Sequence, residues 1–346
     1  MSARRPRRAA SPSPNGARVT IVDVARVAGV SVSTVSKVIN DRYGVSPETY
    51  DKVMDVVAEL GYESSLVASS LRRRSTNVIG VLVPEFEPFS AELLKGISSA
   101  AEGTGYELLA YSGNLEHNQV GWERRSLSRL AGTLIDGAVI VAPTATVTDA
   151  TIPVVAVDPH TGRTGPSTIE VDNVGGARAA TQHLIDLGHR RIAHVRGRED
   201  LVSASQREQG YREALEAAGL PFDRALVRVG GYRALETTDA ARELLTLPEP
   251  PTAVFAANDL SAIRVLEIAA ELGVRVPEDL SVAGFDNVPE AANAVPPLTT
   301  VAQPMREMGA EAVRILLGLL AGEAGEEHLR LPATLVVRAS TAPLSA

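Results

Sequence analysis

The chain has 346 residues, of which 45% are hydrophobic, and this length and composition predict a globular protein of two or three domains. It has no cysteine, which excludes disulfides, thiolate metal sites and cysteine nucleophiles and favours a cytoplasmic location. The net charge of −8 is unevenly divided, since residues 1–76 hold 12 Lys and Arg against 7 Asp and Glu, while the remainder holds 22 against 35. A basic head thus precedes an acidic body, and the head alone would attract nucleic-acid phosphates.

The first 18 residues are rich in Arg, Ser and Pro and contain no apolar run. This composition is unlike that of a signal peptide or a membrane anchor and predicts a disordered basic tail. We therefore expect the folded part of the chain to begin near residue 19.

Residues 20–40 have the pattern of two short helices joined by a glycine turn. Thr20 is the expected N-cap of the first helix, Asp23 completes a variant of the capping box, and Gly29 supplies the turn. The second helix begins at Ser31. It places Val35 and Val38 inward and leaves four residues facing outward, namely Val32, Ser33, Ser36 and Lys37. In a helix-turn-helix unit these four would face a DNA major groove, although such patterns also arise by chance in helical proteins.

A third helix is predicted downstream, with Ser46 as its N-cap, Pro47 as its first residue and Gly61 at its end. Its expected apolar stripe contains Tyr50, Val53, Val57 and Leu60. A short helix is then expected from Ser65 to Arg72, with Leu66, Ala68 and Leu71 as its apolar residues and three arginines at its end. It is too short to be stable alone.

From Val78 onward, short apolar runs alternate with helical patterns. Eight such runs are NVIGVLVP, YELLAYS, DGAVIVAP, PVVAVDP, RIAHVRG, ALVRVG, TAVFAAND and LSVAGFDN. Runs of this kind are typical of parallel sheets covered on both faces by helices. Eight strands are too many for one small sheet, so residues 167–173 are predicted to cross between two halves.

Polar side chains follow several of these runs, and in open α/β sheets ligands bind beyond the carboxyl ends of the strands. These residues are Asp158, Asp172, Asn258, Asp259 and Asp286. For each of them, an N-cap of the following helix is the alternative interpretation. The N-cap is the preferred one for Asp172 and Asp259, whereas the other three are predicted to contact a ligand.

Several motifs occur in one order along the chain. They are T-I-x-D-V-A at 20–25, A-G-V-S-x-x-T-V-S at 28–36, V-S-P-E-T at 45–49, L-G-Y at 60–62, A-S-S-L-R at 68–72, I-G-V-L-V-P at 79–84, G-H-R-R-I at 188–192, A-N-D at 257–259, G-F-D at 284–286 and P-P-L-T-T-V at 296–301. In this order they resemble the lactose-repressor and galactose-repressor family of transcription regulators over nearly the whole chain.

The resemblance implies a small all-α helix-turn-helix DNA-binding head with a hinge helix. An α/β periplasmic-binding-protein-like body of two Rossmann-like subdomains would follow, crossed three times by the chain and holding a ligand in its cleft. The expected ranges are 1–18 for the tail, 19–63 for the head, 64–76 for the hinge and 77–346 for the body. Within the body, the amino-terminal subdomain is expected at 77–171 and 300–331, and the carboxyl-terminal one at 172–299 and 332–346.

For DNA, the resemblance assigns base reading to Val32, Ser33 and Lys37, although the family more often has arginine at the last of these positions. Leu71 is expected to insert into the minor groove at the operator centre, beside a phosphate contact from Arg72. Ser65 replaces the commoner hinge asparagine. Further phosphate contacts are expected from Thr20, Ser31, Thr34, Ser36 and Asn40.

For the ligand, Arg207 matches a family arginine whose paired donors bind neighbouring oxygens, with a solvated helix arginine as the alternative. Phe89 and Tyr232 fall where the resemblance puts aromatic walls, with core packing as the alternative. Such a site suits a sugar. The chain has Glu87-Pro88-Phe89-Ser90 where the family commonly has Asn-Pro-Phe-Phe, so the ligand itself is not carried over. The single tryptophan, Trp122, is expected on a helix surface, outside the pocket.

Motifs typical of enzymes are missing, since there is no G-x-S-x-G, G-x-x-x-x-G-K or H-E-x-x-H, nor a G-x-G-x-x-G after a strand. We therefore expect no catalysis, no cofactor and no metal, with a sugar-processing enzyme and an exported solute-binding protein as alternatives. The predicted function is a dimeric cytoplasmic transcription regulator, usually a repressor in this family. It would bind a near-palindromic operator in double-stranded DNA and respond to a small molecule, a sugar or oligosaccharide.

Overall fold

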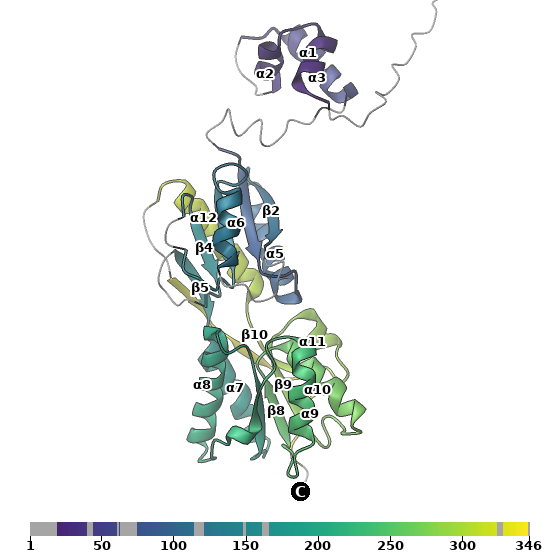
Figure 1. The fold of residues 1–346 in the computed structure, drawn as a ribbon, viewed down its shortest axis with the longest axis vertical. Helices are drawn as coiled ribbons and strands as arrows, with labels where there is room; N and C mark the ends of the chain where they lie inside the picture. Colours follow the sequence, from purple (N-terminus) through teal and green to yellow (C-terminus); the bar gives the residue numbers. More distant parts are fainter. Residues whose placement is uncertain are drawn as a thin grey trace, which may run out of the picture. The chain divides into compact units, whose positions relative to one another are not determined.

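The computed structural model describes residues 19–39, 44–60, 62, 75–113, 121–147, 150–160, 166–323 and 328–344 (Figure 1). Contacts within the chain divide it into two compact units, Met1–Arg74 and Ser75–Ala346. Three predicted DNA contacts, Asn40, Leu71 and Arg72, lie outside the described residues, as does the short helix expected from Ser65 to Arg72.

In the first unit the described residues form α1 (Ile21–Ala28), α2 (Val32–Ile39) and α3 (Pro47–Leu60). Their inward faces share a small core that includes the two valines predicted on α2. The buried members of this core are Val24, Ala25, Ala28, Val35, Val38, Val53 and Val56. Burial of one face of each helix stabilises elements that are too short to persist alone.

Local hydrogen bonds begin and end these helices. The Asp23 carboxylate accepts hydrogen bonds from the backbone N–H of Thr20 at 3.0 Å and from its hydroxyl at 2.6 Å. Gly29 has a left-handed φ of 63°, which turns the chain toward α2. The Thr49 N–H donates to the Ser46 hydroxyl at 3.3 Å, so Ser46 caps α3. These contacts confirm the predicted caps of the helix-turn-helix unit.

The apolar stripe of α3 differs from the predicted one. Tyr50 is 37% exposed, whereas Val56 joins Val53 in the core, with Val57 and Leu60 packed at its edge. Val56 lies three residues after Val53 and therefore shares its face of the helix. The tyrosine, in the first turn, keeps part of its amphipathic side chain in water.

The second unit contains two six-stranded sheets (Figure 1). The strands of the first are β1 (Val78–Val83), β2 (Glu107–Ser112), β3 (Gly137–Val141), β4 (Val154–Val157), β5 (Ser167–Val171) and β11 (His328–Leu331). Their order is β11-β5-β4-β3-β1-β2, and all pairs are parallel. The segment predicted to cross between the halves therefore begins with a strand, β5, of the first sheet.

The strands of the second sheet are β6 (Ile192–Arg196), β7 (Val227–Val229), β8 (Ala253–Ala256), β9 (Ser281–Asp286), β10 (Thr299–Ala302) and β12 (Thr334–Val336). Their order is β12-β10-β9-β8-β6-β7, and the β10–β12 pair alone is antiparallel. The chain crosses between the sheets after β5, β10 and β11. The second crossing follows Ala302, slightly after the boundary expected at residue 300, because β10 pairs with β9.

Helices cover both faces of each sheet. Around the first sheet they are α5 (Pro88–Ala101), α6 (Trp122–Leu130) and α12 (Met305–Leu320), and around the second they are α7 (Asn173–Asp186), α8 (Val202–Ala217), the 3₁₀ turn η1 (Arg224–Leu226), α9 (Ala234–Leu245), α10 (Asp259–Glu271) and α11 (Pro289–Asn293). In β1, Ile79, Val81 and Val83 pack with the α5 and α12 core, while Val78 and Leu82 pack with the α6 core. This alternation explains why the strand is apolar at every position.

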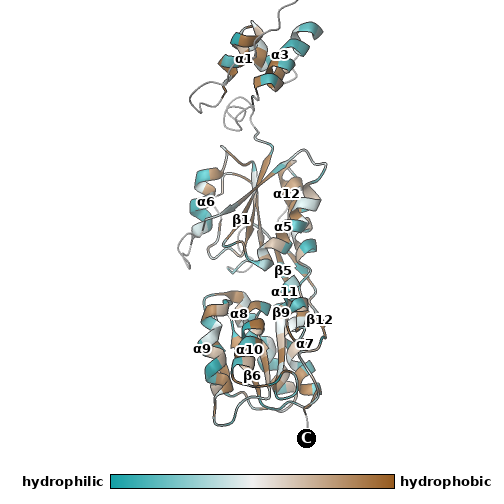
Figure 2. Cartoon of the chain, turned by 90° about the vertical axis from the view of Figure 1, so that its right-hand side faces the viewer, coloured by the Kyte–Doolittle hydropathy of each residue, from teal (hydrophilic) through white to brown (hydrophobic). Residues whose placement is uncertain are grey.

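The hydropathy pattern agrees with this layering. In Figure 2, α6 and α9 alternate between teal and brown along their length, as expected for helices with one face on a sheet. None of the helices in the described ranges is both long and apolar enough to span a membrane.

Candidate functional site

A cavity lies between the two sheets of the second unit. Its walls come from the loops after β1, β3 and β4 of the first sheet and the starts of α5 and α6. On the side of the second sheet they come from the loops after β6, β7 and β8, together with α8 and the ends of β9 and β10. It encloses about 950 Å³ of empty space including its open mouth, at the upper end of the range typical of small-ligand sites. All six predicted ligand residues line it, namely Phe89, Asp158, Arg207, Tyr232, Asn258 and Asp286.

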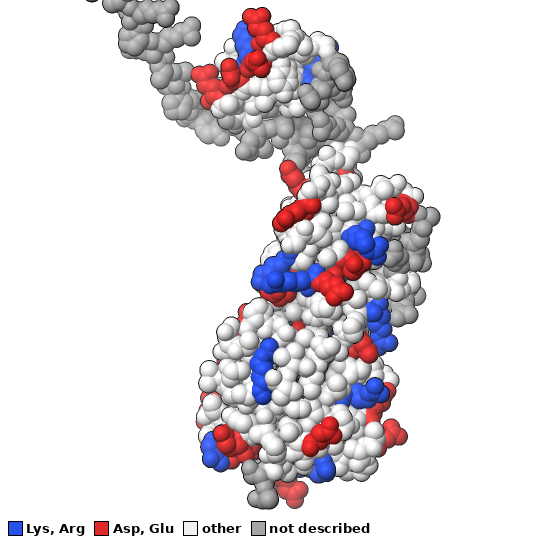
Figure 3. All heavy atoms as spheres, turned by 180° about the vertical axis from the view of Figure 1, so that it is seen from behind, with Lys and Arg blue, Asp and Glu red and all other residues white. Residues whose placement is uncertain are grey.

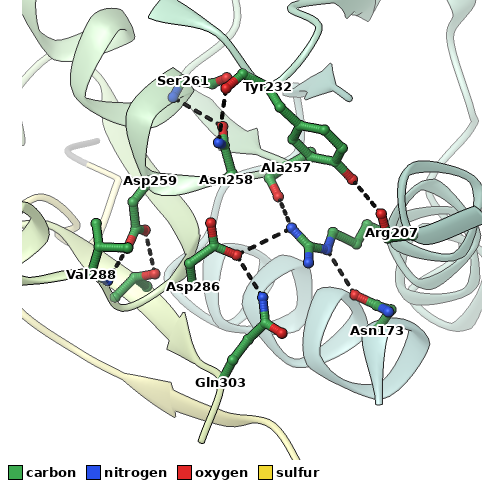
Figure 4. A network of polar contacts seen from close by, with 12 residues as sticks. Asn173, Arg207, Tyr232, Ala257, Asn258, Asp259, Ser261, Asp286, Val288 and Gln303 are labelled. Atoms are coloured by element: carbon green, nitrogen blue, oxygen red, sulfur yellow. Dashed lines mark hydrogen bonds and ion pairs between the residues drawn. The ribbon is translucent and has the colours of Figure 1, made fainter. Parts of the chain in front are cut away.

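Arg207 is the centre of a hydrogen-bond network in this cavity (Figure 4). Its side chain is only 4% exposed and extends from α8. Nε donates to Asn173 Oδ1 at 2.8 Å, and Nη1 donates to the Ala257 carbonyl and lies 3.3 Å from Asp286 Oδ1. The guanidinium also lies 3.8 Å from the centre of the Phe285 ring. Within the described chain Nη2 makes no hydrogen bond, so the held guanidinium keeps one donor nitrogen for a ligand.

Asp286 links Arg207 to the segment that crosses between the sheets. Gln303, which follows β10, donates from Nε2 to Asp286 Oδ1 at 2.7 Å. Asp286 itself has an unusual φ of 114° at the end of β9. Burial raises the pKa of Asp286 to about 6, although the Arg207 charge and the Gln303 hydrogen bond oppose that shift. The carboxylate is therefore mostly ionised at neutral pH, although burial of its charge is unfavourable.

Asn258 and Tyr232 are tied to each other on the same wall (Figure 4). The Asn258 side chain accepts a hydrogen bond from Ser261 N–H at 3.0 Å, as the N-cap of α10, and donates to the Tyr232 carbonyl at 3.1 Å. The Tyr232 hydroxyl is 3.1 Å from Ser203 Oγ. The N-cap alternative thus describes Asn258, although the residue also lines the cavity.

The two aspartates assigned mainly to N-caps have different roles. Asp172 caps α7 and accepts from Gly175 N–H at 3.0 Å, which confirms its assignment. Asp259 is not a cap, because Asn258 occupies that position one residue earlier. Its fully buried carboxylate instead accepts from Val288 N–H at 2.9 Å and from the Thr300 hydroxyl. Burial and the nearby Asp286 charge raise the pKa of Asp259 well above its usual value.

The cavity residues on the side of the first sheet make fewer hydrogen bonds to other described residues than those on the second-sheet side. Asp158, with a φ of 51° after β4, is buried, and within the described ranges its carboxylate forms no hydrogen bond. Phe89 lies in the first turn of α5 and packs partly on the core. His160 follows Asp158, and burial lowers its pKa, so its ring is neutral at physiological pH.

Trp122 was expected outside the pocket, and this expectation is wrong. The side chain is 1% exposed, packs in the α6 core with Leu82 and Ile140, and lines the cavity. The expectation is based on the arginines that follow Trp122, which give α6 the composition of a surface helix. The buried face of α6 begins with Trp122 itself, because the helix packs on β1.

A charged cluster at the cavity, formed by Glu85, Glu87 and Arg233, was not predicted. Arg233 of the second sheet's side forms an ion pair with Glu85 of the first, 148 residues away in the chain. Burial and the adjacent Glu85 charge raise the pKa of Glu87 to about 7. The strand-end rule could have found Glu85, which follows β1, but no local signal pairs it with Arg233.

On the first unit, the three predicted base-reading residues lie on α2. Val32 is 40% exposed, and Ser33 and Lys37 are also exposed. Ser31 Oγ lies 2.7 Å from Ser33 Oγ and 2.8 Å from Thr34 Oγ1, so a cluster of hydroxyls marks the start of this helix. Ser36 is half-buried and Thr20 is exposed.

Figure 3 shows basic and acidic side chains next to one another on the visible face of the second unit, without a patch of one sign. This face therefore gives no extended attraction for a polyanion.

Residues 20–65 match the bacterial regulatory proteins of the lacI family, and residues 181–341 match a periplasmic binding protein-like domain. The HTH-type transcriptional regulator CelR of Thermobifida fusca is 38% identical over 340 residues, covering 93% of this chain and 98% of the relative. The HTH-type transcriptional regulator DegA of Bacillus subtilis is 35% identical over 339 residues, covering 95% and 99%.

Solved structures agree with these matches. A complex of the transcriptional regulator CelR with cellobiose has a TM-score of 0.68 and 36% identity, covering 93% of this chain and all of that chain. The Lac repressor dimer bound to operator and the anti-inducer ONPF has a TM-score of 0.78 and 29% identity, covering 94% and 100%. With a helix-turn-helix unit, a ligand-sized cavity between two α/β sheets and relatives that match along nearly its whole length, the chain belongs to the lacI family of bacterial regulatory proteins.

Proposed function

We propose that this chain is a DNA-binding transcriptional repressor of the cytoplasm whose operator affinity is controlled by a carbohydrate bound in the cavity. One observation carries the proposal. The same chain holds an exposed recognition helix and, in its other unit, a buried guanidinium with one nitrogen left for a ligand. Close relatives are transcription regulators and not enzymes, so a catalytic role is not proposed.

The effector would be held mainly by hydrogen bonds to its hydroxyls. Arg207 would donate from Nη2, and Asp158 and Asp286 would accept from ligand hydroxyls. Phe89 and Tyr232 would supply apolar surface for the faces of a sugar ring. Asn258, whose amide is already used by the protein, would act chiefly by holding Tyr232 and α10 in place.

DNA would be read by α2 in the major groove. Val32, Ser33 and Lys37 would contact bases, with Lys37 as a point charge toward guanine acceptors. Leu71 would insert at the operator centre, beside Arg72 on a phosphate. The proposed phosphate contacts are Thr20, Ser31, Thr34, Ser36 and Asn40. We assign residues 19–63 to the DNA-binding domain, 64–76 to the hinge and 77–346 to the effector-binding domain.

Regulation would work through a homodimer on a near-palindromic operator. An effector that binds one state of the cleft more tightly shifts the population toward that state. A coupling of about 1 to 3 kcal/mol changes operator affinity roughly 5- to 150-fold. Since the CelR relative was solved with cellobiose, cellobiose is the first carbohydrate to test.

The test combines two measurements on the full chain with cellobiose, D-ribose and other mono- and oligosaccharides. A thermal-shift screen should identify a stabilising sugar, because ligand at 100 times its dissociation constant adds about 2.7 kcal/mol. Gel shifts on operator DNA selected from a random library should then change with that sugar and not with the others. Release of sugar products during the assay, or operator affinity indifferent to every stabilising sugar, would contradict the proposal.

A further inference from the structure

Buried polar atoms without a hydrogen-bond partner occur in several of the residues that line the cavity. Among the described residues, five buried side-chain N or O atoms make no hydrogen bond, and three of them belong to residues that line the cavity. These three are Trp122 Nε1, His160 Nδ1 and Gln303 Oε1. Buried polar groups are normally paired, so three unpaired ones in residues of one cavity point to a ligand with matching donors and acceptors.

The residues on both sides of Trp122 are held by hydrogen bonds. On one side, Gly121 N–H donates to Thr144 Oγ1 at 3.3 Å, and on the other the Glu123 carboxylate accepts from Ala145 N–H. Both contacts fix the start of α6 to the loop that follows β3. Packing with Leu82 and Ile140 then holds the indole in place, while its N–H has no hydrogen-bond partner in the described part of the chain.

Core packing alone does not explain this arrangement. A buried tryptophan usually finds a hydrogen-bond partner for its N–H, and a phenylalanine or leucine would fill the same apolar space without an unpaired donor. The indole N–H can only donate, so its partner must be an acceptor such as a hydroxyl or ring oxygen.

We propose that Trp122 is an effector-binding and specificity residue, whose Nε1–H donates to an oxygen of the carbohydrate. This inference rests on the proposed function. Gln303 Oε1 complements it, because its Nε2 is fixed on Asp286 and the oxygen can then accept from a ligand hydroxyl. Trp122 lies on the first-sheet side and Arg207 on the second-sheet side, so one ligand bound by both would join the two walls.

The sequence allows this single atom to be changed. Trp122 is the only tryptophan of the chain, so growth of a tryptophan auxotroph on benzothienylalanine replaces it with an isostere in which sulfur stands for N–H. With cellobiose, or another sugar from the thermal-shift screen, we expect calorimetry to give an affinity 2- to 12-fold weaker for the substituted protein, the range of one neutral hydrogen bond. Its melting temperature without sugar should not fall, because no protein hydrogen bond is lost.

Tyr211→Phe is the matched control. Tyr211 Oη donates to the Ile192 carbonyl at 2.8 Å in a different core, so this variant should melt earlier yet bind the sugar as the unsubstituted chain does. Trp122→Phe is a second variant and should also weaken binding. In the unsubstituted chain, sugar should shift the Trp122 fluorescence to longer wavelength as the N–H becomes paired.

The outcomes separate the two proposals. Equal affinity of the unsubstituted and benzothienylalanine proteins, with no change in fluorescence on saturation, would overturn the role of Trp122 and leave a carbohydrate effector standing. If the unsubstituted chain binds no sugar in calorimetry, the carbohydrate function fails and this inference fails with it.

Discussion

The two walls of the cavity are built differently. On the second-sheet wall, Arg207, Asp286 and Asn258 are held by hydrogen bonds within the protein, so their geometry is fixed before a ligand arrives. On the first-sheet wall, the Trp122 indole Nε1 is buried and has no hydrogen-bond partner in the described part of the chain. The residues of the second-sheet wall are thus preorganised. On the first-sheet wall, we expect the ligand to supply the missing hydrogen-bond partner. Such a division lets ligand binding favour one arrangement of the two walls.

The largest expected effect comes from disrupting the preorganised wall. Arg207→Ala removes the proposed Nη2 donor to the ligand and leaves the Asp286 carboxylate without its ion-pair partner. Loss of one charge-assisted hydrogen bond costs about 1.5 to 3 kcal/mol. Sugar affinity should therefore fall by about 10- to 150-fold in calorimetry, while operator binding persists. The matched control is Arg212→Ala on the same helix, because Arg212 is half-exposed and pairs with Glu208. Equal losses in both variants would show that Arg207 acts only on the stability of α8.

The helix α2 offers the next test. It too combines side chains that are hydrogen-bonded within the protein with side chains that are exposed. Ser31 Oγ already contacts other hydroxyls, whereas Lys37 is exposed. Lys37→Ala should cost about 1 to 3 kcal/mol on the operator and much less on random DNA, because a base contact discriminates between sequences. Anisotropy titrations over a salt series measure both affinities.

Lys52→Ala on α3 is the control, as it removes the same charge from an exposed position without a predicted base contact. If Lys37→Ala weakens operator and random DNA alike, Lys37 binds only phosphate. Sequence reading would then belong to Val32, Ser33 and the deformability of the operator.

Local chemistry accounts for what the sequence predicts well. The caps formed by Thr20, Ser46 and Asp172 depend on residues within three positions, and the strand-end rule places Arg207's partner Asp286 in the cavity. The sequence does not predict a side chain's position where packing between distant segments determines it. The position of Trp122 depends on which face of α6 meets β1, and Asp259 is drawn inward by Val288 and Thr300.

The charged cluster gives a smaller, pH-dependent effect. The pKa of Glu87 rises from 4.5 to about 7 in the folded chain, so the folded state binds the proton more tightly than the unfolded state. The contribution of Glu87 to the free energy of unfolding is thus full below about pH 4.5 and is lost as the pH rises to about 7. Since Glu87 is half-exposed, we expect a loss of only about 1 kcal/mol.

Glu87→Gln should abolish this loss, so its advantage in melting temperature over the unsubstituted chain should grow from pH 5 to pH 8. Glu107→Gln, at an exposed position on β2, is the control and should show no such growth. A constant difference between the Glu87→Gln and unsubstituted chains across this range would exclude a raised pKa at Glu87.

The smallest effect tests the link between the walls. Glu85 and Arg233 are each about three-quarters buried, and a double-mutant cycle of Glu85→Gln and Arg233→Gln should give a coupling of about 0.5 kcal/mol in the free energy of unfolding.

The two substitutions should shift the pKa of Glu87 in opposite directions. The Glu85 charge raises the pKa of Glu87 and the Arg233 charge lowers it, so Glu85→Gln should move the Glu87 titration to lower pH and Arg233→Gln to higher pH. Carboxyl carbon NMR of Glu87 measures both shifts. Shifts of the same sign would contradict the opposite effects of the Glu85 and Arg233 charges on Glu87.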